Sequence, residues 1–293
     1  MSISNLQENL ENGTFVITTE IGPPKGVNVE TCIDEAEEYL KERCTAVNVT
    51  DNQSSVMRFG SMAACRFLLD RGIEPVLQMV CRDRNSIALQ SDALSAYGLG
   101  IRNVLAITGD HQSLGDHPQT AGVFDLDSVG LLQALTGLEN GKDLSGNDLD
   151  GAPQFFKGAV VTPCADPVEP QIIKMKKKIQ AGAEFFQTQA VYDAEQFKSF
   201  MEPVSRLDVP VIAGIVMLKS AGMAKFMNSN VAGVHVPEQM IKEMAETEKG
   251  KRAEKSIQIT ANLIKDLKDL CQGIHIMSLG WEKHIPAILD RVL

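Results

Sequence analysis

The sequence predicts a (β/α)8 barrel (a TIM barrel), and three observations carry that prediction. Short runs of β-branched and aromatic residues alternate with amphipathic segments along the chain. Eight such pairs fit into about 250 residues, the usual size of this barrel. Several amphipathic segments end at a glycine just before the next apolar run, at Gly72, Gly100 and Gly182, as tight helix-to-strand turns do. We therefore expect a closed parallel sheet that forms a single domain over residues 1–293.

The predicted strands are the short apolar runs, which are rich in residues that favour the pleated backbone. They cover residues 14–20, 45–50, 74–80, 103–108, 158–163, 183–189, 209–216 and 273–279. Apolar residues at helical spacing predict helices over 28–43, 54–72, 85–100, 126–140, 170–183, 193–206, 220–229 and from Trp281 onward.

Two stretches depart from this regular alternation. The Lys- and Glu-rich segment 237–272 predicts extra helices before the last strand, and 141–154 predicts a polar loop. A doubly wound sheet is the second interpretation of the same pattern. It is disfavoured because no G-x-G-x-x-G follows the first strand.

The composition argues against several classes of protein. The net charge of −10 argues against nucleic acid or an anionic membrane as a partner. No run approaches the roughly 18 apolar residues that a membrane span needs, and the N-terminus is polar and acidic, unlike a signal peptide. The six cysteines form no C-x-x-C pair, and no histidine has a partner at metal-binding spacing. We therefore expect a cytoplasmic protein without a bound metal.

Polar residues gather where the predicted strands end. In a (β/α)8 barrel the active site forms at the carboxyl ends of the strands. An unpaired polar group in a buried strand costs about 1–3 kcal/mol, so several such groups on one rim indicate a ligand site. The residues are Glu20, Thr50, Asp51, Asn52, Gln78, Thr108, Gly109, Asp110, His111, Thr162, Asp166, Gln187 and Gln189.

Glu20 is the most informative of them, because it ends a β-branched strand and Gly22, Pro23 and Pro24 fix the backbone directly behind it. Ordinary structural interpretations remain open: Glu20 as a turn carboxylate, 108–110 as a strand-to-loop turn, and Gln189 as a satisfied core amide.

The basic run at 174–178 also has two interpretations. Such a run is typical of a solvated helix face. However, Lys174 and Lys178 are four residues apart and share one side of the predicted helix, so they can flank a phosphate.

Five segments in register on successive strands resemble the methylenetetrahydrofolate reductase family. They are TEIGPPKG, AVNVT, ITGDH, TPCADP and AGAEFFQTQAVYD, and the similarity runs from about Phe15 to the C-terminus. The resemblance implies a flavin-bearing (β/α)8 barrel that reduces 5,10-methylenetetrahydrofolate to 5-methyltetrahydrofolate. It implies FAD rather than FMN as the cofactor.

The resemblance also assigns roles to individual residues. Glu20 matches the family's catalytic glutamate, the general acid for opening of the folate ring, and Asp110 matches an aspartate beside flavin and pterin. Gln189 matches a glutamine that contacts the pterin, so Glu20, Asp110 and Gln189 are the expected substrate-binding residues. The expected cofactor-binding residues are Thr50, Asp51, Gln78, Thr108, Gly109, Asp110, Thr162, Asp166, Lys174, Lys177 and Lys178.

Departures from the NADH-dependent bacterial enzymes cluster at the surface that the family uses for the second substrate. Gln78, Thr108, Thr162 and Asp166 stand where those enzymes carry histidine, arginine, tyrosine and histidine. Their stacking phenylalanine and C-terminal tyrosine and arginine correspond to Ala221, Met277 and Trp281.

The chain thus resembles the short reductases of acetogens and other anaerobes, which work with a cysteine-rich, electron-delivering partner subunit. We accordingly expect an oligomer or a heterocomplex. Three alternatives stay open: an NADH enzyme with a repacked site, a non-catalytic or methyl-transferring folate-binding barrel in a larger complex, and an unrelated lyase or aldolase. The last needs a Schiff-base lysine at a strand end, and no convincing one is found.

Overall fold

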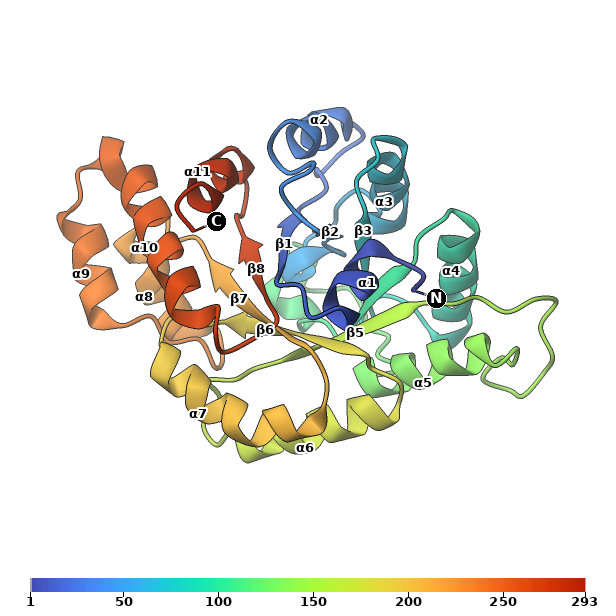
Figure 1. The fold of residues 1–293 in the computed structure, drawn as a ribbon. Coiled ribbons are helices and arrows are strands. Elements are labelled where there is room, and N and C mark those ends of the chain that lie inside the picture. The colour runs from blue at the N-terminus through green and yellow to red at the C-terminus, as the bar shows by residue number, and fades with distance from the viewer. Residues whose placement is uncertain (1, 293) are drawn as a thin grey trace.

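The computed structural model describes residues 2–292 and shows a closed barrel of eight parallel strands in the order of the sequence (Figure 1). The strands are β1 (Val16–Ile21), β2 (Ala46–Val49), β3 (Pro75–Val80), β4 (Asn103–Ile107), β5 (Phe156–Val161), β6 (Phe185–Ala190), β7 (Val211–Val216) and β8 (Gly273–Met277). Each predicted strand overlaps one of these, and β1 pairs with β8 to close the sheet. The predicted fold class is confirmed.

Helices cover the outside of the barrel. They are α1 (Asn5–Glu11), α2 (Glu30–Tyr39), α3 (Ser61–Asp70), α4 (Ser86–Gly98), α5 (Ser128–Glu139), α6 (Glu169–Gln180), α7 (Ala194–Val204), α8 (Ala221–Asn230), α9 (Glu238–Glu246), α10 (Arg252–Leu267) and α11 (Ile285–Leu289). No helix within residues 2–292 combines the length and the apolar character that crossing a bilayer requires.

Three helices lie between β7 and β8, which confirms extra helices before the last strand; Figure 1 shows them grouped beside these strands. Within the stretch 237–272, α10 is the helix that covers the barrel, because it packs on β7 and buries Ile257, Leu263 and Leu267. The additional helices are α8 and α9, which pack on each other.

The helix predicted over 54–72 is shorter in the structure. It begins only at Ser61, and a 3-10 turn, η1 (Gln53–Ser55), precedes it. Asn52, Ser54 and Ser55 have positive φ angles of 44°, 54° and 59°, which a helix cannot contain.

Helix α1 was not predicted, and it covers the amino-terminal end of the barrel. Ser4 caps it by accepting a hydrogen bond from the Gln7 backbone N–H. Leu6 and Leu10 pack into the apolar cluster formed by the first inward-facing residues of the strands. The Glu74 carboxylate fixes the helix, because it accepts from the backbone N–H groups of Asn5 and Leu6.

The barrel interior changes from apolar to polar along the strands. The lowest layer is apolar and consists of Val16, Ala46, Val76, Leu105, Phe156, Phe185 and Ile212. Because inward-facing residues recur every second position, the next layer contains Thr18, Asn48, Gln78, Gln187 and His275. Glu20 and Thr50 follow one layer higher, at the carboxyl ends of β1 and β2. The polar groups therefore lie at the end of the barrel where an active site is expected.

Candidate active site

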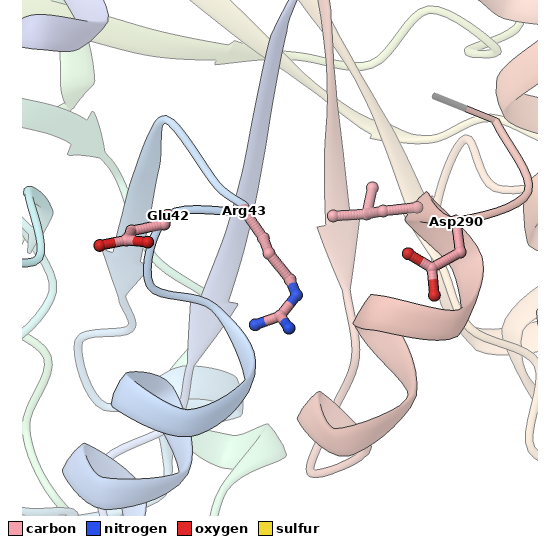
Figure 2. A pocket seen from close by; sticks show the side chains of 4 residues that line it. Glu42, Arg43 and Asp290 are labelled. Carbon is pink, nitrogen blue, oxygen red and sulfur yellow. The ribbon is translucent and has the colours of Figure 1, made fainter.

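Two hollows distinguish the ends of the barrel. One, of about 300 Å³, lies at the carboxyl end of β1, and its lining includes Glu20, Cys32, Gln53, Arg58 and Glu282. The other, of about 430 Å³, lies at the opposite end, between the segment before β2 and the end of α11. Figure 2 shows this second hollow with Glu42, Arg43 and Asp290 on its walls. Of the residues predicted from the sequence, Glu20 lines the first hollow, which lies at the end of the barrel where the chemistry is expected.

Glu20 is buried at the mouth, with 5% of its surface exposed. Its Oε1 accepts a hydrogen bond of 3.2 Å from Gln53 Nε2, and its Oε2 lies 3.7 Å from His275 Nε2. Behind it, the Pro23 carbonyl accepts from Arg58 Nη1 at 3.1 Å and the Pro24 carbonyl accepts from the Phe59 N–H at 2.8 Å. The loop after β1 is therefore docked on the loop after β2, which gives Glu20 a defined position.

A hydrogen-bonded network fills the layer below Glu20. His275 Nδ1 lies 3.0 Å from Thr18 Oγ1, and Gln187 Nε2 lies 3.5 Å from the same hydroxyl. The amides of Asn48 and Gln187 form two mutual hydrogen bonds, of 2.7 and 3.2 Å. The side chains of four strands thus connect Glu20 to the centre of the barrel.

His275 is not among the polar residues at strand ends that the sequence indicates. The available signal was its position on the last strand, where it pairs in register with Thr18 of the first strand. That register depends on barrel closure, which the sequence pattern alone does not specify.

Asp110 lies in an exposed loop at the end of β4. The preceding Gly109 has a φ angle of +94°, and a Cβ atom there would stand 2.2 Å from Val80 Cγ2. Only glycine fits this close approach without displacing a neighbour. The hydroxyl of Thr108 accepts from the Ser128 N–H at 3.1 Å, so Thr108 also holds the start of α5.

Asp51 has a structural role in this structure. Its Oδ2 accepts from the Val80 N–H at 2.9 Å and pairs with Arg84, which also binds Asp92. Burial raises the pKa of the Asp51 carboxyl, and the neighbouring Arg84 opposes that effect. Its carboxylate thus joins the loops after β2 and β3, so it has little freedom to contact a cofactor.

Gln189 lies at an irregularity of β6. The register with β7 shifts between Gln187 and Ala190, so one extra residue is accommodated on β6. The Thr188 hydroxyl compensates by accepting from the Gly214 N–H at 2.8 Å. Bulges of this kind redirect side chains beside active sites. Gln78, in contrast, lies in a regular part of β3 and is half-buried.

The three predicted lysines of α6 differ in their environment. Lys174 and Lys177 are exposed, whereas Lys178 is buried, with 7% of its surface exposed. Lys178 Nζ donates to the Val160 carbonyl at 2.5 Å, and no carboxylate within residues 2–292 forms an ion pair with it. Burial, with a contribution from Lys174, lowers the pKa of Lys178 to about 8.

Thr162 and Asp166 follow β5. Thr162 packs against Gly233 from the segment between α8 and α9, where a Cβ atom would stand 2.1 Å from the Thr162 methyl group. Asp166 is exposed.

Ala221, Met277 and Trp281, which the resemblance matches to aromatic and basic groups of the NADH enzymes, lie around β7 and β8. Ala221 begins α8, Met277 ends β8 and Trp281 follows in the next loop. Lys219 Nζ lies 5.3 Å from the centroid of the Trp281 ring and donates to the Leu279 carbonyl.

The loops after the first four strands are bound to one another. Lys25 of the first loop pairs with Asp116 of the fourth, and Asp116 Oδ1 accepts from the Met57 N–H of the second at 3.3 Å. Lys25 and His117 lower the pKa of Asp116 through these contacts. Gly115 lies so close to Ser55 that a Cβ atom would overlap its carbonyl oxygen.

Fold and site together define a (β/α)8 barrel with a buried carboxylate over a polar network at its mouth. Within residues 2–292, no three His, Cys, Asp or Glu side chains gather as metal ligands would. A family model described as methylenetetrahydrofolate reductase matches residues 5–293. The chain belongs to the methylenetetrahydrofolate reductase family, a family of oxidoreductases, which confirms the resemblance found in the sequence.

Relatives with this name differ in length. "Methylenetetrahydrofolate reductase 2" of Schizosaccharomyces pombe is 26% identical over 99% of this chain, but the chain spans only 47% of that protein. "5,10-methylenetetrahydrofolate reductase" of Salmonella typhimurium is 24% identical over 78% of this chain and 73% of its own length. The Escherichia coli enzyme of the same name is 24% identical over 77% of this chain and 72% of its own.

Two solved structures share the fold. An uncharacterised Clostridium thermocellum protein that binds two copies of 5-methyl-5,6,7,8-tetrahydrofolic acid superposes with a TM-score of 0.62. It is 18% identical, over 99% of this chain and 98% of its own. Oxaloacetate acetylhydrolase superposes with a TM-score of 0.56 at 12% identity, over 99% of this chain and 86% of its own.

Proposed function

We propose that this chain reduces 5,10-methylenetetrahydrofolate to 5-methyltetrahydrofolate with a bound flavin. Family membership and the names of the bacterial relatives support the substrate. The observation that carries the proposal is the buried Glu20 carboxyl group, which is held at the barrel mouth between Gln53 and His275. A fixed, partly desolvated acid of this kind suits general acid catalysis.

The residues around the mouth fit a flavin nucleotide. Thr50 Oγ1 is buried without a hydrogen-bond partner within the described residues, which is unfavourable unless a ligand supplies one. Lys178 is a buried cation without a paired carboxylate, and a pyrophosphate group would supply the missing negative charge. FAD is proposed over FMN because it carries that pyrophosphate. When bound, the flavin supplies the hydride.

The protein's own groups bind the folate and move its proton. Glu20 donates a proton to the folate nitrogen that leaves as the five-membered ring opens to an iminium ion. His275, hydrogen-bonded through Thr18, stands beside Glu20 and fixes the orientation of the carboxyl group. Asp110 and Gln189 bind the pterin from the loop after β4 and from the bulge of β6.

We also propose that a cysteine-rich partner subunit, rather than NAD(P)H, delivers the electrons, so that the chain works in the cytoplasm as part of a complex. The support is the sequence resemblance, which implies that Ala221, Met277 and Trp281 stand where the NADH enzymes carry a stacking phenylalanine, a tyrosine and an arginine. An absent stacking ring removes about 1 kcal/mol of contact. Brisk NADH-driven turnover by the isolated chain would contradict this part.

A non-catalytic or methyl-transferring folate-binding barrel is the second candidate. It is favoured by the structural similarity to the Clostridium thermocellum protein that binds 5-methyltetrahydrofolate. Such a barrel needs no flavin, so a colourless protein that still binds the folate would support it.

The deciding experiment is anaerobic. The purified chain is loaded with FAD, reduced chemically and mixed with 5,10-methylenetetrahydrofolate while its visible spectrum is recorded. Return of the oxidised flavin band together with 5-methyltetrahydrofolate supports the reductase. A flavin that stays reduced contradicts it. Glu20→Gln is expected to slow reoxidation by about 100-fold or more while flavin binding is kept.

A further inference from the structure

Arg82, in the loop after β3, is the only fully buried arginine within residues 2–292, with 2% of its surface exposed. Its guanidinium makes a two-pronged contact with Asp83, in which Nε and Nη2 each lie 2.7 Å from a carboxylate oxygen. Burial alone would raise the pKa of Asp83, but the bonds from Arg82 and Asn52 lower it instead. The guanidinium is buried and Asp83 is exposed, and the two parallel hydrogen bonds between them fix the plane of the guanidinium.

The remaining donors of Arg82 hold the neighbouring loops by their backbones. Nη2 donates to the Asn52 carbonyl at 3.2 Å and Nη1 donates to the Asp110 carbonyl at 3.2 Å. The Arg82 carbonyl accepts from the Val123 N–H at 2.7 Å. Arg82 therefore contacts both ends of the long loop between β4 and α5.

The contact with Asp110 concerns the backbone alone. The Asp110 side chain is exposed, so its carboxylate stays available to a ligand while its carbonyl is fixed. Gly109 lies flat on Val80 and on Arg82, whose Cβ would stand 3.2 Å from a Cβ at Gly109. The position of the Asp110 carboxylate thus depends on the hydrogen bond from Arg82 to the Asp110 carbonyl.

We propose that Arg82 is a positioning residue that acts on the folate through Asp110. This inference rests on the proposed folate site. A lysine at position 82 keeps the charge but cannot reproduce the fork that reaches Asp83, Asn52 and Asp110 together. A matched control is Arg102, which donates to the carbonyl groups of Tyr97 and Ile101 at the other end of β4.

The test measures binding of 5-methyltetrahydrofolate to the flavin-loaded full chain by calorimetry. Arg82→Lys is expected to weaken binding about tenfold, since the hydrogen bond that fixes the Asp110 carbonyl is lost. Asp110→Asn should weaken binding too, and the double variant should bind no more weakly than Asp110→Asn alone, because both changes act on one contact. Arg102→Lys should bind as the unchanged protein does.

Melting temperatures show whether each variant folds. If Arg82→Lys does not fold, Asp83→Asn, which keeps the arginine but loosens its anchor, is combined with Asp110→Asn in the same way. Unchanged affinity, or losses that add in the double variant, would overturn the inference. A natural chain that does not bind the folate would overturn this inference and the proposed function together, whereas binding without reduction would overturn only the reductase.

Discussion

Replacing Lys178 with methionine distinguishes two effects of its buried charge: the cost to the stability of the flavin-free chain and the contribution to flavin binding. Burial lowers the pKa of Lys178 from 10.5 to about 8. Each pKa unit corresponds to about 1.4 kcal/mol, so a charged Lys178 costs the folded chain about 3 kcal/mol at neutral pH. Methionine removes that cost but also the hydrogen bond to the Val160 carbonyl, about 1 kcal/mol. We expect Lys178→Met to stabilise the flavin-free chain by about 2 kcal/mol.

The pH dependence follows from the sign of the shift. Below pH 8 Lys178 is protonated in both the folded and the unfolded chain, so the full cost is present. As the pH rises from about 8 toward 10.5, the folded chain loses this proton first and the cost disappears. The advantage of the methionine variant should therefore be largest near pH 7 and should shrink by pH 10.

Urea unfolding of the flavin-free proteins at the two pH values measures this difference. Titration with FAD measures the effect on flavin affinity. Loss of the charge-assisted hydrogen bond that we propose between Lys178 and the pyrophosphate should weaken FAD binding about 10- to 100-fold. Lys176→Met, an exposed change on the same helix, is the control and should alter neither quantity. A variant that is less stable than the natural chain at pH 7, or that binds FAD equally well, would refute this reasoning.

Three further predictions concern the barrel itself. Asn48→Leu should destabilise the chain by about 1–3 kcal/mol in urea unfolding, because it leaves the Gln187 amide without its partner. Adding Gln187→Leu to this variant should cost less free energy than Asn48→Leu did, because the two amides bind each other. Two equal losses that add would contradict the pairing. Leu6→Ala should cost about 2–5 kcal/mol, and an unchanged melting curve would show that α1 does not seal the barrel. Gly109→Ala should lower the melting temperature and weaken folate binding, because its Cβ meets Val80; folate binding at natural strength would contradict the positioning of Asp110 by this turn.

The sequence predicted the barrel because its signals are local. Strands, helices and the turn glycines Gly72, Gly100 and Gly182, with φ angles of 72°, 94° and 108°, each depend on a few neighbouring residues. Helix α1 was missed because it has seven residues and a polar surface, and only Leu6 and Leu10 face the barrel. Its position depends on Glu74, far along the chain.

The candidate site was predictable residue by residue but not as a network. Glu20 and Thr50 lie at strand ends, as the alternation of polar and apolar residues indicated. The contacts of His275 with Thr18 and Glu20 need a closed barrel, and those of Arg82 need three loops in place. Asp51 shows a limit of the opposite kind. It lies at a strand end, as the predicted site residues do, but nothing in the neighbouring sequence indicates that Arg84 forms an ion pair with its carboxylate.

The bound loops after β1 to β4 also affect how reactants reach the mouth. Contacts of Lys25, Asp116, Arg58 and Arg82 join these loops, so we expect this half of the rim to be the more rigid one. If the folate and the electron donor use the same opening in turn, we expect part of the rim to move so that the opening can widen. We therefore expect the mouth to widen on the other half, where fewer contacts are described: Gly233 packs on Thr162, and Lys219 donates to the Leu279 carbonyl. We thus expect the loops after β5 and β7, rather than those beside Glu20, to control how reactants enter and leave the mouth.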